Sequence, residues 1–318
     1  MDILGIDIGK TKFDAWLITQ AGQRHVSLPN TQAGFDQLAD WLTRHRGQTQ
    51  PLHACMEATG NYGLDLASVL FTRGEVVSIV NPRRIKAFGQ AELARNKTDK
   101  QDAGLIARFC KAQCPPAWQP PAAHLRELRE LTRRCGALKA MRTQELNRLK
   151  SGFASTVLRQ SLERMIDQLD AEIARVSAEI RRLIEADHAL ETNLALLTSI
   201  PGIGEVTAAL LLAELPNIAE FEPKGLAAFA GLSPAEHSSG QRIRPGGISR
   251  IGNPIVRSAM YLCALSARRH NPILASFAKR LQDAGKPNRV ILIAVARKLL
   301  VLAHAVIRTQ TAFAAEAG

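Results

Sequence analysis

Four acidic residues stand where the sequence predicts a strand to end or a helix to begin. Asp7 and Glu57 each close a short apolar run, and Asp99 and Asp102 lie three residues apart at a predicted helix start within residues 95–103. Side chains at that spacing share one helix face, so both can reach a single metal ion. Because α/β proteins place functional groups at strand ends, the four carboxylates together predict a metal site.

Asp99 has a second explanation that requires no metal. Thr98 followed by Gln101 is a capping-box pattern. An acid in the first turn of a helix stabilises the macrodipole by about 0.3–1 kcal/mol. Since Asp7 and Glu57 also lie at strand ends, metal binding is the favoured interpretation.

The basic charge of the chain is concentrated near its C-terminus. The 318 residues carry a net charge of +12, and residues 231–318 contain 13 basic and 3 acidic side chains, against 14 and 15 in residues 116–230. A field focused in this way favours a polyanion such as DNA or RNA. Together with the carboxylates, it predicts a magnesium-dependent enzyme that acts on nucleic acid.

The cysteines and the N-terminus indicate a reduced compartment. The five cysteines form no CxxC pair, their number is odd, and the start of the chain is too short and too acidic for a secretory leader. No run of about 18 apolar residues is evident, so no membrane span is expected. The expected location is the prokaryotic cytoplasm, in association with the nucleoid.

The pattern of the first third predicts an α/β domain. The expected elements are strands over 3–9, 12–18 and 24–28, a helix over 32–45, a strand over 53–57, a helix over 64–72 and a strand over 75–80. Hairpin-like strands followed by alternating helices and strands resemble the ribonuclease H-like order.

A proline-rich boundary near 114–121 precedes a segment of different character. Residues 124–187 carry leucine and isoleucine at heptad-like spacing, with charges of both signs on the other faces. This pattern predicts an antiparallel helical hairpin or coiled coil, bent near Gly152, that acts as a spacer or an oligomerisation arm. The expected domains are residues 1–114, 115–190 and 191–318.

Two segments of the last domain suggest contacts with phosphate. Pro201-Gly202-Ile203-Gly204 between apolar helices is typical of a helix-hairpin-helix motif, in which glycines let backbone N–H groups approach a phosphate. A tight turn without a ligand is the alternative. The second segment is a glycine-rich polar loop over 237–253, which carries Arg242, Arg244 and Arg250 and leads into further apolar helices over 254–269 and 288–308.

These motifs together resemble the DEDD-type insertion-sequence transposases. That family consists of bridge-RNA-guided serine recombinases and is related to the Piv/MooV DNA invertases. The resemblance covers almost the whole chain. It rests on Gly-Ile-Asp at 5–7, Glu-Ala-Thr-Gly at 57–60, Asn-Pro at 81–82, Arg-Asn-Lys-Thr-Asp-x-x-Asp-Ala at 95–103, Gln-Glu-Leu-Asn-Arg at 144–148, Ile-Pro-Gly-Ile-Gly at 200–204, Phe-Ala-Gly-Leu-Ser-Pro at 229–234 and Ser-Gly at 239–240.

The resemblance implies an α/β plus α architecture with a RuvC-like N-terminal domain. Asp7, Glu57, Asp99 and Asp102 would bind Mg²⁺, with Mn²⁺ as a substitute. The C-terminal domain would supply a serine nucleophile, which family precedent places directly before the glycine of the Ser-Gly motif.

In this sequence that serine is Ser239. Ser238 is its neighbour, and Ser249, in a stretch that also resembles the family, is the second candidate. The chain departs from the family where a further serine and an Arg-Gly pair usually follow, because Gln241, Arg242 and residues 244–246 stand there.

The resemblance also implies partners. The substrates would be donor and target double-stranded DNA, joined through a phosphoserine intermediate. A non-coding bridge RNA would select them, and a homo-oligomer, a dimer or a tetramer, would act on them. The residues expected to contact nucleic acid are Arg95, Lys97, Gly202, Gly204, Arg242, Arg244 and Arg250.

Three rival functions compete with this one. A RuvC-like, metal-dependent nuclease of the junction-resolvase type would use water in place of the serine. A sugar kinase or actin-like ATPase would use residues 5–11 as a phosphate loop, but no second glycine-rich loop is evident. A catalytically inactive DNA-binding protein is the third, and the presence of all four carboxylates argues against it.

Overall fold

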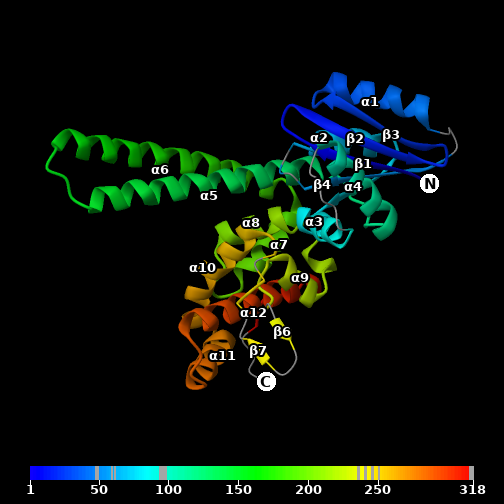
Figure 1. Cartoon of the computed structure of the whole chain (residues 1–318). Coiled ribbons are helices and arrows are strands. Elements are labelled where there is room, and N and C mark those ends of the chain that lie inside the picture. Colours follow the sequence, from blue (N-terminus) through cyan, green and yellow to red (C-terminus); the bar gives the residue numbers. More distant parts are fainter. Residues whose placement is uncertain are drawn as a thin grey trace. The chain divides into compact units, whose positions relative to one another are not determined.

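The chain forms two compact units, Met1–Pro120 and Pro121–Gly318 (Figure 1). The computed structural model describes residues 1–46, 50–58, 60, 62–92, 99–234, 237–239, 242–244, 247–249 and 251–314; for residues 99, 100, 237–239 and 242–244 it describes the backbone alone. Each unit has its own hydrophobic core.

A five-stranded mixed sheet forms the centre of the N-terminal unit, in the order β3-β2-β1-β4-β5 (Figure 1). The strands are β1 (Asp2–Ile8), β2 (Lys12–Thr19), β3 (Gly22–Pro29), β4 (Leu52–Glu57) and β5 (Val76–Val80). β1 pairs antiparallel with β2 and β2 with β3, whereas β4 runs parallel to β1 and β5 parallel to β4. The predicted α/β order is confirmed, and the sheet is consistent with a RuvC-like domain.

Helices cover both faces of this sheet. α1 (Gln32–His45) and α2 (Leu64–Thr72) lie on one face, and α3 (Pro82–Ala91) and α4 (Asp99–Gln113) lie on the other (Figure 1). Side chains alternate along a strand, so Leu4 and Ile6 pack toward α1 and α2 while Ile3 packs toward α4. The α4 face therefore also receives the residues at positions 5 and 7 of β1.

Helix α4 rests on strand β1 at Gly5. A Cβ atom placed on Gly5 would lie 2.2 Å from the Ala107 nitrogen and 2.3 Å from the Ala103 oxygen, both backbone atoms of α4. The absence of a side chain at position 5 is therefore what allows the helix to approach the strand.

We predict that Gly5→Ala destabilises the N-terminal unit by about 3 kcal/mol, because the new methyl group meets backbone that cannot move independently. The matched control is Gly104→Ala on the facing helix. There the new Cβ would make ordinary contacts with Trp16, 3.4 Å at the nearest, and alanine favours the helix by about 0.5–1 kcal/mol. Urea unfolding of both variants is the measurement. Equal effects would contradict the proposed packing.

The proline-rich boundary is fixed to the sheet by a buried serine. Ser78 Oγ lies 3.0 Å from the Pro115 oxygen and 2.8 Å from the Pro116 oxygen, and 2.8 Å from His53 Nε2. The Trp118 nitrogen donates to the Val77 oxygen at 2.6 Å. The segment that leaves the sheet thus runs along β5.

The C-terminal unit begins with two long helices, α5 (Ala123–Lys150) and α6 (Thr156–Glu185), which lie side by side (Figure 1). Cys135 and Leu138 of α5 pack with Leu169 and Val176 of α6. Arg142 and Asp170 form an ion pair across the two helices. We call α5 and α6 the arm; its classification as a coiled coil stays a prediction.

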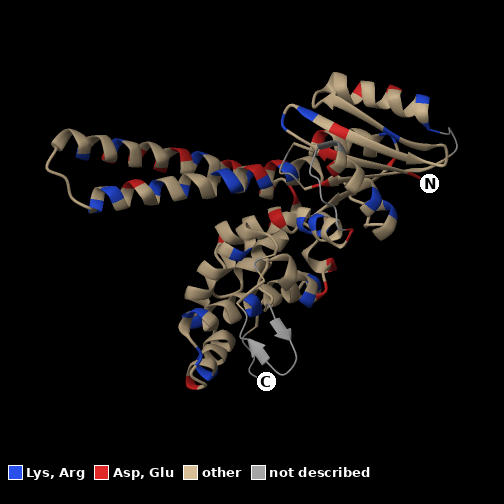
Figure 2. Ribbon diagram, in the orientation of Figure 1, with Lys and Arg blue, Asp and Glu red and all other residues tan. Residues whose placement is uncertain are grey.

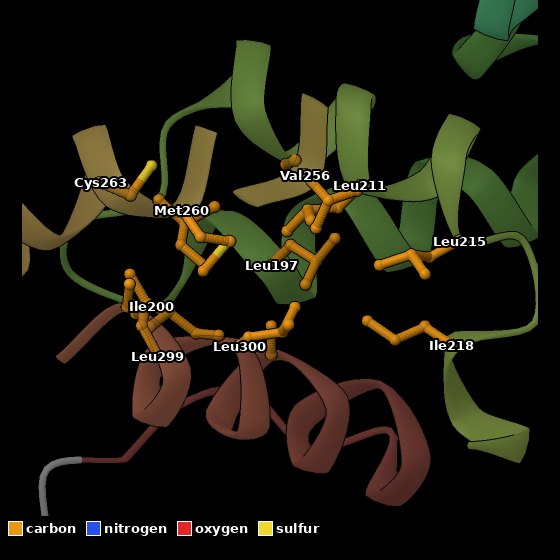
Figure 3. Packing of buried hydrophobic residues seen from close by; sticks show 14 of the residues in the cluster. Leu197, Ile200, Leu211, Leu215, Ile218, Val256, Met260, Cys263, Leu299 and Leu300 are labelled. Carbon is orange, nitrogen blue, oxygen red and sulfur yellow. The ribbon is translucent and has the colours of Figure 1, made fainter. Parts of the chain in front are cut away.

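The remaining helices form one core around α12 (Figure 3). They are α7 (His188–Thr198), α8 (Glu205–Glu214), the 3₁₀ helix η1 (Ile218–Glu220), α9 (Pro223–Phe229), α10 (Pro254–His270), α11 (Pro272–Asp283) and α12 (Asn288–Thr309). Leu299 and Leu300 of α12 are fully buried against residues such as Leu197 and Met260. Basic positions occur along α10 to α12 with few acidic ones among them (Figure 2).

Within the described part of the chain, α12 is long and apolar enough to cross a membrane by length and composition. The sequence predicted no segment of this kind, and α12 is an exception by length and composition. The same helix is the centre of the core, with Val295, Ala296, Leu299 and Leu300 all buried. Burial of this kind is what a core helix of a folded unit requires, so the apolar composition is weak evidence for a membrane.

One carboxylate is buried where α5 meets α8. The Glu214 side chain is 2% exposed and accepts two hydrogen bonds from Arg133, at 2.6 and 3.0 Å. Burial alone would raise the pKa of Glu214, but hydrogen bonds from Arg133 and Asn253 and the charges of Arg133 and Arg129 together hold it below the ordinary value of 4.5.

A pKa that is lowered in the folded state gives a definite pH dependence. The ionised Glu214 contributes stability above pH 4.5, and this contribution is lost as the pH falls through the lowered folded-state pKa. We expect Glu214→Gln to be less stable than the parent at neutral pH, with a smaller further loss between neutral and strongly acidic pH. Urea midpoints across that range measure the difference. Parallel curves would show that Glu214 titrates alike in both states.

Candidate functional site

Asp7 and Glu57 are neighbours at the carboxyl ends of β1 and β4. The parallel register pairs Ile6 with Met56, so Asp7 and Glu57 are the next residues along both strands. Ile6 and Met56 belong to the core beneath α1 and α2; alternation therefore puts both acids on the α4 face. Adjacent strands lie about 5 Å apart, and both acids are half-buried.

Helix α4 brings Asp102 toward the same edge. Ala103 and Ala107 lie over Gly5, and Cys110 Sγ lies 3.8 Å from the His53 oxygen at the start of β4, so α4 runs antiparallel to both strands. From Gly5 to Asp7 the strand advances about 6.6 Å, which corresponds to roughly four or five helical residues. The level of Asp7 therefore falls near residues 99–102 of α4.

Topology thus places Asp7, Glu57 and the N-terminal turn of α4 at one edge of the sheet. Among the side chains that the structure describes, which leave out Asp99, no three carboxylate, imidazole or thiol groups gather as a metal site. Asp102 is half-buried. Arg95, Lys97 and the capping residue Thr98 lie outside the described residues, so those predictions stay predictions.

The sequence analysis missed a fifth acid on this face, Asp14. The antiparallel register pairs Asp14 of β2 directly with Asp7. Its buried carboxylate lies 2.8 Å from His25 Nε2 and 3.4 Å from Lys12 Nζ. A two-residue turn after Gly9 fixes this register, so counting back from the predicted hairpin would have found it.

Asn30 joins the two loops that follow the strand-end acids. Its Nδ2 donates to the Gly9 oxygen and to the Tyr62 oxygen, both at 3.0 Å. Gly9 lies two residues after Asp7, and Tyr62 lies in the connection between Glu57 and α2. The bond therefore holds both connections at the carboxylate edge, and nothing in the sequence pattern identified it.

The segment predicted as a polar loop contains a short antiparallel ribbon. β6 (His237–Ser239) pairs with β7 (Arg242–Arg244), with Ser239 opposite Arg242. Pro234 and Ile248 form a bridge, and the Ser249 nitrogen donates to the Ser233 oxygen at 2.9 Å. Its polar, glycine-rich composition indicated a loop, but the backbone pairing forms without an apolar strand pattern.

The two candidate serines occupy different parts of this ribbon, which we call the serine hairpin (residues 233–249). Ser239 is the last residue of β6, whereas Ser249 lies at the base. The Ser249 Oγ accepts a hydrogen bond from the Ile251 nitrogen at 3.3 Å, typical of a local turn. Arg242 and Arg244 lie in β7, while Arg250 lies outside the described residues.

The Pro201–Gly204 segment connects α7 to α8. Gly202 has a φ of 107°, and a Cβ there would lie 2.6 Å from the Ala267 Cβ of α10. Gly204 is the N-cap of α8, without a side-chain cap and with open space around its Cα. Turn geometry and close packing therefore explain Gly202 without a ligand, and the phosphate contact stays a prediction.

We predict that Gly202→Ala destabilises the C-terminal unit by about 2–3 kcal/mol, through both backbone strain and the contact with α10. Gly204→Ser is the matched control, because serine is a good N-cap and should change stability by less than about 0.5 kcal/mol. Urea unfolding measures both changes. A tolerated Gly202→Ala would mean that the turn is not held against α10.

A mixed sheet with acids at its strand ends, consistent with a RuvC-like domain, and a helical unit of net positive charge suit the class of proteins that process nucleic acid. A transposase family model for DEDD-type IS110 enzymes matches residues 4–158, and the model described as "Transposase IS116/IS110/IS902 family" matches residues 194–279. The chain belongs to this transposase family and is therefore a DNA-processing enzyme.

Individual relatives agree with that assignment. The chain is 35% identical to the pilin gene-inverting protein of Moraxella lacunata over 314 residues, which cover 98% of this chain and 97% of the relative. The Moraxella bovis protein of the same name is also 35% identical over the same length. The transposase for insertion sequence element IS1111A of Coxiella burnetii is 25% identical over 226 residues, 62% of this chain and 61% of the relative.

Proposed function

We propose that this transposase cuts and rejoins donor and target DNA through a phosphoserine intermediate at Ser239. The observation that carries the proposal is the position of Ser239 at the end of β6, away from the hairpin base, with Arg242 in the opposite register position. Ser249 is engaged at the hairpin base by its backbone and its hydroxyl. A nucleophile needs access to the phosphodiester, and this favours the residue farther from the bonds at the hairpin base.

In this proposal the N-terminal unit binds the metal ion. Asp7, Glu57, Asp99 and Asp102 would hold Mg²⁺, or Mn²⁺ in its place, because carboxylate oxygens are the donors that such ions prefer. Bound there, the metal would offset the negative charge that develops on the phosphate oxygens. Support comes from the register of Asp7 beside Glu57 and from the direction of α4.

Each chemical step exchanges one phosphate ester bond for another. The Ser239 oxygen attacks phosphorus, its proton passes to a base or solvent, and the bond from phosphorus to one deoxyribose oxygen breaks as that oxygen takes up a proton. A deoxyribose hydroxyl of the other duplex then attacks the phosphoserine, and the serine oxygen leaves. Arginines, Arg242 and Arg244 among them, would contact the phosphate. No ATP is consumed.

We further propose a bridge RNA that selects both duplexes and a dimer or tetramer that carries out four strand cuts in the cytoplasm. The clustered positive charge of residues 231–318 suits binding to nucleic acid backbones. Base pairing between the RNA and each DNA would then select the DNA sequences, while the protein contacts phosphates. Gly202, Gly204, Arg95, Lys97 and Arg250 are proposed as further contacts.

The test is incubation of the protein with Mg²⁺, RNA from the flanking DNA and labelled donor and target duplexes, followed by a denaturing gel for protein-linked DNA. We expect an adduct that Ser239→Ala abolishes and Ser249→Ala retains. Asp102→Asn should abolish both cleavage and adduct.

Other outcomes assign other functions. Cleavage without an adduct, lost in Asp102→Asn, would identify a RuvC-like nuclease that uses water. An adduct that persists in Ser239→Ala and disappears in Ser249→Ala would move the nucleophile to the hairpin base. Full activity without added RNA, in RNA-free protein, would remove the guide from the proposal.

A further inference from the structure

Three helical segments of the C-terminal unit meet at the buried carboxylate of Glu214. Its Oε1 accepts from Arg133 Nε at 2.6 Å, and its Oε2 accepts from Arg133 Nη2 at 3.0 Å and from Asn253 Nδ2 at 2.7 Å. Arg129, one turn before Arg133, donates its Nε to the Ala213 oxygen at 2.9 Å. The arm helix α5, the end of α8 and the residue before α10 are thereby joined.

Asn253 can make this bond in one orientation only. Its Oδ1 caps α10 by accepting from the Ile255 and Val256 nitrogens at 2.9 and 3.2 Å. Rotation of the amide by 180° would place an N–H group against these two donors. The amide nitrogen is therefore committed to Glu214, and the Asn253 backbone nitrogen donates to the Phe229 oxygen at 2.6 Å.

Asn253 is also the point at which the chain returns from the serine hairpin to the helices. It lies four residues after Ser249, whose nitrogen bonds to Ser233 at the hairpin base. A two-stranded ribbon alone is at best marginally stable. The direction in which this ribbon projects therefore depends on how its ends are anchored.

We propose that Glu214 is a positioning residue for the serine hairpin, acting through Asn253, and that it ties the hairpin base to the root of the arm through Arg133. The proposal rests on the proposed function of Ser239. Stability alone accounts poorly for the arrangement, because a buried ion pair stabilises little more than a well-packed apolar group of similar size. An apolar group would also give Asn253 no acceptor and no fixed orientation.

An exchange of amide and carboxylate between positions 214 and 253 tests the bond. In Glu214→Gln the new amide N–H group faces a donor of Arg133 in either orientation of the amide, and it also faces the Asn253 amide when it takes the place of Oε2. In Asn253→Asp the cap of α10 is kept, but a carboxylate oxygen faces Glu214 Oε2. The double variant Glu214→Gln/Asn253→Asp restores a donor and an acceptor in reversed order between positions 214 and 253, and the carboxylate at position 253 still caps the helix. The bond from Arg133 Nη2 to position 214 stays lost in the double variant.

Rates of protein–DNA adduct formation should follow this pattern. We expect each single variant to lose on the order of 100-fold, because small displacements of a nucleophile have effects of that size. The double variant should be faster than either single variant, because the bond between positions 214 and 253 is restored. Asp170→Asn, which breaks an ion pair of the arm away from the hairpin, is the control and should keep the parental rate.

Hydrogen–deuterium exchange of the full-length protein gives a readout that is independent of chemistry. Peptides covering 233–253 should exchange faster in both single variants and return toward the parental rate in the double variant. If the parent forms no adduct, the proposed function fails while this exchange pattern still tests the anchor.

Two results would overturn the inference. The first is folded single variants with parental exchange in 233–253 and parental adduct rates. The second is a double variant that regains the parental melting temperature but forms the adduct no faster than the single variants, which would show that Glu214 stabilises the fold without positioning the hairpin.

Discussion

The contact between α4 and β1 at Gly5 fixes where the acidic residues of the N-terminal unit can lie. With no Cβ at position 5, the backbone of Ala103 and Ala107 approaches the strand directly. This close contact sets both the height and the direction of α4, which carries its first turn to the level of Asp7. A larger residue at position 5 would lift the helix and separate Asp102 from the strand-end acids. The placement of the acids thus depends on a residue that has no side chain.

Much of the N-terminal unit could be predicted because its signals are local. Strand runs of apolar residues, the turn after Gly9 and the amphipathic pattern of α1 each identify an element, and the observed bounds agree within a few residues. The edge that gathers Asp7 and Glu57 follows from parallel pairing, which the order of elements implies. Asp14 was not predicted, although the hairpin register pairs it with Asp7. It lies inside a strand, whereas the predicted acids were sought at strand ends.

The hairpin and its anchor could not be predicted for a physical reason. β6 and β7 are three residues each and contain one apolar residue, Ile243, so neither alternation nor propensity distinguishes them from a loop. The bond from Asn253 to Glu214 joins residues 39 positions apart, and that from Arg133 to Glu214 joins residues 81 apart. Such pairs depend on how the helices pack, and no local pattern in a single sequence predicts them.

The charges of the C-terminal unit divide into two uses. Along the arm, arginines pair with nearby acids, as Arg175 does with Glu172 and Arg182 with Glu179, and these exposed pairs contribute little stability. The arm carries 13 basic and 9 acidic side chains, so its positive excess is smaller than that of residues 231–318, which carry 13 and 3. The larger part of the basic excess lies beyond the arm, in the hairpin and in α10 to α12.

Glu214 stands between these two regions and is the one carboxylate in the described chain that both α5 and the residue before α10 contact. Any movement of the arm root would reach the hairpin through this carboxylate, because Arg133 and Asn253 share its Oε2. If Ser239 is the nucleophile, as proposed, a fixed path of this kind would hold it in one geometry. The same bond also explains why an ionised group is retained among the buried residues of this unit.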